Sequence, residues 1–294
     1  MNRLKPFAYF EPTTLPEAIE ILAAKKGAAF PLAGGTDLLV RMKRGVIKPS
    51  TIVNLKRIEG LDQIKKEPGR GVRIGALATF SAIEDSHLLR LSHPVIAQAV
   101  SVLACPSIRN LATMGGNIGR ASPASDAAPF LMILGATVSL KGPQGERELG
   151  MGEIFSGPGT TASRPAEAIT SLLLPDMASH SGAAYLKIGR REGMDCALAG
   201  VAALVTFSGG KREAEDTKIA LSAVAPVPMR AKKAEKTILS GRLTEKCIRE
   251  AAKVASEEIS PVSDMRASAS YRREVVRVLT YRALMTALQQ AREG

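Results

Sequence analysis

The 294-residue chain contains no tryptophan, and aromatic residues make up only 4% of it. Proteins that hold single-stranded nucleic acid stack the bases on aromatic side chains, and zinc-finger patterns and RNP motifs are also lacking. The formal net charge is +12, but the basic residues are spread along the whole chain. Nucleic-acid binding is therefore a remote alternative, because an anionic cofactor, an acidic partner subunit or no specific partner at all explains the charge equally well.

Cysteine is scarce as well. Cys105, Cys196 and Cys247 are odd in number, far apart and never in a Cys-x-x-Cys pair. This spacing excludes an iron–sulfur cluster or a zinc site built from this chain alone, and the three histidines have no metal-ligand spacing. We expect free thiols in a reducing compartment.

Long apolar runs are absent too. A stretch such as residues 197–207 is much shorter than the about 20 residues of a membrane-spanning helix, and no apolar signal run appears near the N-terminus. We therefore expect a cytoplasmic protein without a membrane span.

The composition, with 45% hydrophobic and 23% charged residues, is that of a globular protein, and the length predicts two or three domains. Apolar periodicity predicts helices at 14–25, 81–89, 94–102, 127–134, 230–239, 244–256 and 271–292. Short apolar runs predict a strand leading from residue 30 into a glycine turn and strands at 51–55, 72–76, 136–140, 184–188, 197–207 and 218–224. Strands with segregated helices indicate an α+β fold.

Local signals refine this outline. Thr14 and Glu17 fit a capping box, and turn chemistry predicts a hairpin at residues 142–145 and a turn at 208–210. A cluster of serine, histidine and glycine at 177–182 marks the expected domain boundary. One apolar face of the last helix is expected to comprise Tyr271, Val275, Val278, Met285 and Leu288.

Two glycine pairs, Gly34-Gly35 and Gly115-Gly116, stand in apolar, strand-like surroundings beside Thr36 and Thr113. Glycine permits positive φ and lets backbone N–H groups approach a ligand, and successive N–H groups in a turn form a nest for an anion such as phosphate. Neither pair belongs to a Gly-x-Gly-x-x-Gly or P-loop motif, so those two nucleotide-binding folds are unsupported. One pair alone is weak evidence, since most such pairs are ordinary turns.

Residues 33–39, Ala-Gly-Gly-Thr-Asp-Leu-Leu, resemble the first FAD motif of the medium subunits of molybdenum hydroxylases. This family includes xanthine dehydrogenase, carbon monoxide dehydrogenase and 4-hydroxybenzoyl-CoA reductase. Residues 108–110, 113–118 and 122–126 resemble the second motif, 185–191 the lysine-containing strand, and 225–231 with 268–272 the C-terminal domain. The order and spacing agree over nearly the whole chain, which makes the combination specific.

The resemblance implies a two-lobed FAD-binding domain of the vanillyl-alcohol-oxidase/PCMH type, with lobes at residues 1–57 and 58–178, and a C-terminal α+β domain at 179–294. It implies that N–H groups of residues 33–37 and 115–117 cradle the FAD pyrophosphate. The expected cofactor-binding residues are Leu32, Ala33, Gly34, Gly35, Thr36, Asp37, Leu38, Leu103, Thr113, Met114, Gly115, Gly116, Asn117, Asp126, Ile169 and Lys187.

Three polar residues in that set have a plainer alternative. Asp126, expected to accept from a sugar or ribityl hydroxyl, is equally well placed to cap the helix that follows it. Lys187, expected near the flavin or its phosphates, could be a solvated strand residue, and Asn117 could only tolerate a left-handed turn. Met114 could lie against the flavin ring, whereas Arg109 is best explained as an ordinary salt-bridge residue.

In function, the resemblance implies an electron-transfer subunit that carries only FAD. Electrons would pass through a small [2Fe-2S] subunit, with a molybdopterin-containing large subunit acting on the organic substrate, and leave to an external acceptor such as NAD or a quinone. Residues 36–37 and 41–45 resemble the 4-hydroxybenzoyl-CoA reductase branch, yet the short cysteine-free stretch 127–155 lacks that branch's cluster-bearing insertion. A free-standing FAD-dependent oxidoreductase of related fold is the alternative.

Overall fold

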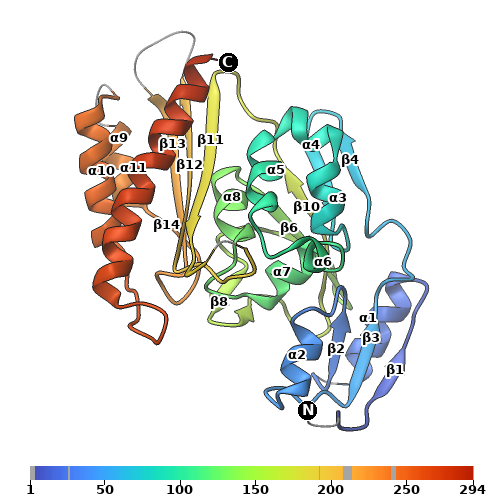
Figure 1. Ribbon diagram of the computed structural model, residues 1–294. Helices are drawn as coiled ribbons and strands as arrows, with labels where there is room; N and C mark the ends of the chain where they lie inside the picture. The colour runs from blue at the N-terminus through green and yellow to red at the C-terminus, as the bar shows by residue number, and fades with distance from the viewer. Residues whose placement is uncertain (1–3, 26, 192, 208–213, 240–242, 294) are drawn as a thin grey trace.

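The computed structural model describes residues 4–25, 27–191, 193–207, 214–239 and 243–293. The N-terminal lobe, at the lower right of Figure 1, is a three-stranded parallel sheet in the order β1–β3–β2. Parallel neighbours require a crossover between them, and two helices provide the connections. The elements are β1 (Ala8–Phe10), α1 (Leu15–Ala24), β2 (Ala29–Leu32), α2 (Leu38–Lys43) and β3 (Thr51–Asn54).

A second, antiparallel sheet has the order β4–β5–β10–β6–β7. Six short helices lie in the sequence between β5 and β6, and they form the centre of the molecule in Figure 1. The strands are β4 (Ile64–Glu67), β5 (Gly71–Gly75), β6 (Thr137–Gly142), β7 (Gly145–Gly150), β10 (Ala168–Leu174) and a separate pair, β8 (Phe155–Gly157) with β9 (Thr160–Thr161). The helices are α3 (Phe80–Asp85), α4 (His87–Ser92), α5 (Pro94–Ser101), α6 (Pro106–Arg109), α7 (Met114–Arg120) and α8 (Ala127–Ile133).

The C-terminal part is a four-stranded antiparallel sheet covered on one face by three helices (Figure 1). Its elements are β11 (Ser181–Ile188), β12 (Ala199–Phe207), β13 (Ala214–Ser222), β14 (Met229–Arg230), α9 (Lys232–Leu239), α10 (Glu245–Glu257) and α11 (Ala269–Glu293). Its other face packs on α5 and α8. No helix in these described ranges is both long and apolar enough to cross a membrane.

The C-terminal sheet contributes to two hydrophobic cores because successive strand residues point to opposite faces. Tyr185 and Leu204 belong to the core of the central helices, whereas Ala184 and Val205 pack under α9, α10 and α11. Strand β12 is buried along its whole length, which explains its nearly uninterrupted apolar sequence. The same alternation places Lys187 on the face of Tyr185, toward the central helices.

The α+β architecture is confirmed, and most predicted helices and strands are present within a few residues of the expected bounds. Thr14 caps α1 by accepting from the N–H of Glu17, and residues 142–145 close the β6–β7 hairpin. The predicted turn at 208–210 lies outside the described residues. The expected helix at 81–89 is instead two helices, because Ser86 adopts an extended conformation and caps α4.

The predicted apolar face of α11 is wrong in two members. Val275 and Leu288 are buried, but Tyr271 and Val278 are exposed. A buried arginine, Arg272, lies on the inner side of the helix instead. Its guanidinium donates to the carbonyl oxygens of Leu198 and Ala223 at 2.5 and 3.0 Å.

Arg272 also pairs with Asp264 at 3.0 Å, so it ties α11 to the segment before it and to the ends of two strands. Replacing Arg272 with Met should lower the free energy of unfolding by roughly 3 kcal/mol, because the carbonyl oxygens of Leu198 and Ala223 both lose a charged hydrogen-bond donor. Thermal unfolding of the full chain would measure this. The exposed Arg273, which donates to Ser256 O, is the matched control: Arg273→Met should change the midpoint little, and equal losses would contradict the buried role.

His93 is fully buried, and its ring nitrogens contact Pro175 O at 2.8 Å and Ser92 Oγ at 2.9 Å. Burial lowers the pKa of His93 from its usual 6.5. The unfolded chain then binds a proton at this histidine more readily than the folded chain does. The free energy of unfolding should therefore fall as the pH drops below about 6.5. His93→Gln should flatten this decline in melting temperatures measured between pH 8 and 5.5. His87→Gln, at an exposed position, should leave it unchanged; an equally steep decline in both would refute the assignment.

Candidate functional site

The two glycine segments lie against each other. A Cβ built on Gly34 would stand 1.9 Å from the carbonyl oxygen of Leu111, and one built on Gly116 would lie 3.7 Å from the Cβ of Ala33. Side chains are therefore excluded at Gly34, and the backbones of the two segments meet directly. The two segments therefore converge, as the family resemblance implied.

The first segment presents open donors. Within the described residues, the backbone N–H groups of Gly34, Gly35, Thr36 and Asp37 have no acceptor in the chain. Gly35 has φ +73, a left-handed conformation that reorients successive N–H groups into a concave nest. A Cβ on Gly35 would meet only the side chains of Leu32 and Leu39, so the nest itself remains clear.

The second segment differs from its predicted form. Gly115 and Gly116 do not make a turn but the first turn of α7, which Thr113 caps through its side chain. The N–H of Gly115 donates to Ala76 O at 2.9 Å, that of Gly116 to Thr113 Oγ1 at 3.1 Å, and that of Asn117 to Thr113 O at 3.0 Å. These donors already have acceptors, so glycine serves here mainly for close packing: a Cβ on Gly115 would lie 2.6 Å from that of Ala76.

Two further alternatives for the second segment fail. Met114 is fully buried in the central core, so it cannot lie against a flavin ring in this conformation. Asn117 is helical, and its Oδ1 accepts from Ser125 Oγ at 2.6 Å. The left-handed residue is instead Ala121, with φ +48, where α7 ends.

Side chains join the segments to their surroundings. Arg120, the last residue of α7, places its Nε 2.9 Å from Oδ2 of Asp37 in the first segment. Ile169 of β10 lies beside α7, with its Cδ1 3.6 Å from a Cβ built on Gly119. Gly116 and Gly119 are exposed, so this part of α7 is an open, side-chain-free surface next to the nest.

Asp126 connects this region to the C-terminal sheet. Its carboxylate accepts from the Tyr185 hydroxyl at 2.7 Å and from Lys187 Nζ at 2.9 Å. The side chains of Lys187 and Asp126 are only 14% and 10% exposed, so Lys187 is not a solvated strand residue. Burial and the nearby Asp126 raise the pKa of Tyr185 well above its ordinary value, which keeps the hydroxyl protonated as the donor.

Asp126 does not cap α8, although it stands at the N-cap position. Ser125 provides that bond, since its Oγ accepts from the N–H of Ala128 at 3.2 Å. Of the two roles left open for Asp126, capping is therefore wrong, and both carboxylate oxygens are directed toward β11.

Other predicted residues lie apart from this cluster. Leu103 is buried in the central core, and its carbonyl accepts from Arg109. Arg109 also pairs with Glu84 at 2.9 Å, which confirms its interpretation as a salt-bridge residue. Leu32 and Leu38, which flank the first segment on either side, pack in a small apolar cluster of the N-terminal lobe.

Sequence reasoning missed Tyr185 and Arg120. Tyr185 lies two residues before Lys187 on the same strand, so alternation alone placed both side chains on one face. Arg120 follows Gly116 by four residues, a spacing that puts them on one side of a helix, but this signal was usable only if residues 114–120 were expected to be helical.

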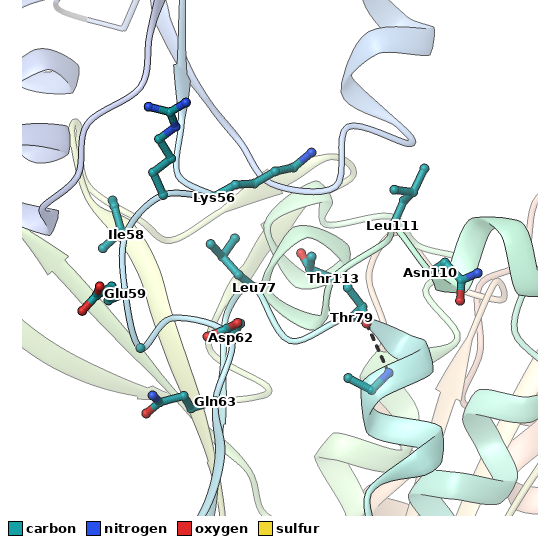
Figure 2. Close-up of a pocket in the computed structure, with 13 residues that line it drawn as sticks. Lys56, Ile58, Glu59, Asp62, Gln63, Leu77, Thr79, Asn110, Leu111 and Thr113 are labelled. Atoms are coloured by element: carbon teal, nitrogen blue, oxygen red, sulfur yellow. Dashed lines mark hydrogen bonds between the residues drawn. The ribbon is translucent and has the colours of Figure 1, made fainter.

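A cavity of about 630 Å³ adjoins the contact between the glycine segments. Figure 2 shows Lys56, Ile58 and Glu59 on one wall, Thr79, Leu111 and Thr113 on the other, and Leu77 between them. The first wall belongs to the connection between β3 and β4. This volume is in the range of small-molecule and cofactor sites.

Two family models match the chain. The family model described as the FAD binding domain in molybdopterin dehydrogenase matches residues 5–177. The model described as the CO dehydrogenase flavoprotein C-terminal domain matches residues 184–287. Together they cover the chain from the N-terminal lobe to α11.

Similar proteins cover the chain along most of its length. The glyceraldehyde dehydrogenase medium chain of Sulfolobus acidocaldarius is 35% identical over 94% of this chain and 96% of its own. The carbon monoxide dehydrogenase medium chain of Afipia carboxidovorans is 33% identical over 97% and 98%. A solved structure of carbon monoxide dehydrogenase from Hydrogenophaga pseudoflava matches with a TM-score of 0.94 and 31% identity, covering 98% of this chain and 99% of that one. The chain therefore belongs to the family of FAD-binding medium subunits of molybdenum hydroxylases.

Proposed function

We propose that this chain is the electron-transferring FAD subunit of a heteromeric molybdenum-containing dehydrogenase. Its partners are a small [2Fe-2S] subunit and a molybdopterin-containing large subunit, and the electrons leave to an external acceptor such as NAD or a quinone. Support comes from relatives named as medium chains, whose length this chain matches almost completely. The three cysteines of this chain are free thiols, which fits clusters carried elsewhere.

The observation that carries the FAD assignment is the nest of open N–H groups at Gly34–Asp37. Four successive donors without a protein acceptor, on residues that are all partly exposed, are accessible to a ligand, and an anionic oxygen satisfies them. The exposed glycine surface of α7 lies alongside. We assign the FAD diphosphate to this nest, with Gly116 and Gly119 giving the cofactor close access to the backbone.

Asp126 and Lys187 extend the proposed site toward the C-terminal sheet. An ionised carboxylate has about four acceptor positions, and two of those on Asp126 are taken by Tyr185 and Lys187. The remaining positions suit a sugar or ribityl hydroxyl. The ammonium of Lys187, fixed by the same carboxylate, adds positive charge close to where the flavin or its phosphates would lie.

FAD, when bound, supplies the one- and two-electron chemistry, so the protein needs to bind and orient it rather than provide a catalytic dyad. Two carboxylates of the C-terminal half serve structural roles. Glu235 accepts from the N–H of Ile219 and pairs with Arg230, and Asp264 pairs with Arg272. This assignment of roles favours a subunit over the alternative of a free-standing oxidoreductase, which needs its own substrate site.

We expect native purification to yield FAD with this chain, and iron and molybdenum with co-purifying chains. Flavin, iron and molybdenum analysis of the purified material measures this. A lone, monodisperse chain that oxidises an organic substrate with FAD alone would support the free-standing alternative.

Replacing Gly35 with Val tests the nest. The β-branched side chain forces the loop away from φ +73 and so disturbs the N–H groups that face the diphosphate, and FAD retention should fall to near zero. Gly45 has φ +70 with nothing near its Cβ position, so Gly45→Val carries a similar backbone strain away from the nest. Flavin absorbance per folded chain is the measurement. Equal FAD occupancy in both variants would refute the nest assignment.

A further inference from the structure

A carboxylate lies at the proposed diphosphate site. Asp37 contributes the last N–H of the nest, and its side chain is 46% exposed. It makes no capping hydrogen bond to α2. A diphosphate brought to the nest would therefore meet a like charge on a residue that also supplies one of the N–H groups, and this opposes binding unless a cation offsets it.

Arg120 is the cation at this position. Its Nε lies 2.9 Å from Asp37 Oδ2, whereas the second cation near Asp37, Arg41, is 3.8 Å away. The Arg120 Nε is buried and its N–H is not aligned with any acceptor in the described residues, Asp37 included. Arg120 thus holds its charge beside the nest, on a side chain that is 31% exposed.

Resting on the proposed function, we infer that Arg120 supplies the positive charge that offsets the FAD diphosphate on the Gly34–Asp37 nest, and that Asp37 holds the guanidinium there before the cofactor arrives. Arginine suits this role because its planar guanidinium remains charged and its several donors can serve a carboxylate and a phosphate oxygen together.

A merely structural bridge between the segments is the competing explanation. The ion pair is partly exposed, with Arg120 at 31% and Asp37 at 46%, and such pairs contribute little to stability. The segments are already held by the backbone contact of Gly34 with Leu111. The bridge is therefore not needed to keep them together.

The two explanations predict opposite patterns for two charge-removing substitutions. If Arg120 offsets the diphosphate, Arg120→Gln should weaken FAD binding by roughly tenfold or more, the effect expected on losing a charge-assisted contact. Asp37→Asn removes the opposing charge but keeps a side-chain oxygen that can hold the guanidinium, so it should leave binding as tight or tighter. The double variant should fall between the two. A structural bridge predicts instead that both single substitutions weaken binding alike.

The measurement is FAD titrated into the flavin-stripped full chain, followed by flavin fluorescence at low and high salt. The salt dependence of affinity should be smaller in Arg120→Gln, because an exposed charge contact is lost. Arg90→Gln, which removes a charge from the exposed Arg90–Asp85 pair, is the control and should change nothing. Arg120→Lys, which keeps the charge, should retain most of the affinity. This result would show that the loss in Arg120→Gln comes from the missing charge and not from a folding defect.

Equal weakening by Arg120→Gln and Asp37→Asn, or an unchanged affinity in Arg120→Gln, would overturn the inference. Either result can occur while the wild-type chain binds FAD and Gly35→Val does not, in which case the proposed function stands without this role for Arg120. A wild-type chain that binds no FAD would overturn both the proposed function and the role of Arg120.

Discussion

The approach of two backbones at Gly34 and Leu111 is the contact on which the site depends. A Cβ at Gly34 would overlap the carbonyl oxygen of Leu111, so only glycine lets the N-terminal lobe press against the central helices here. The contact brings the nest at Gly34–Asp37 beside the exposed glycines of α7. Without it, the first glycine segment and α7 would lie apart, and Arg120 would not reach Asp37.

Glycine has a different structural role in each of the two segments. In the first, positive φ at Gly35 creates open donors; in the second, the N–H groups are already paired, and glycine serves the packing of α7 on Ala76. Identical dipeptides therefore meet different demands, one conformational and one steric. At the other end of the proposed site, alternation along β11 places the side chains of Tyr185 and Lys187 on one face, where both donate to the carboxylate of Asp126.

Sequence patterns predicted the fold class and most elements, because apolar periodicity is a local property, and the family resemblance implied the convergence of the glycine segments. The patterns did not predict that Gly115 lies in the first turn of a helix, since glycine has poor helix propensity and α7 depends on Thr113 capping and on packing against Ala76. Nor could they place Met114 in the core or choose Ser125 over Asp126 as the cap of α8. Those outcomes are decided by contacts between residues distant in the sequence.

The C-terminal sheet has apolar side chains from both of its faces in hydrophobic cores, one shared with the central helices and one under α9–α11. A sheet embedded in this way cannot swing as a rigid flap, because any hinge opening would expose apolar surface from a continuous core. For the electron-transferring subunit proposed above, such rigidity would have a direct benefit. It would hold the distance between a bound cofactor and the redox groups of partner subunits constant.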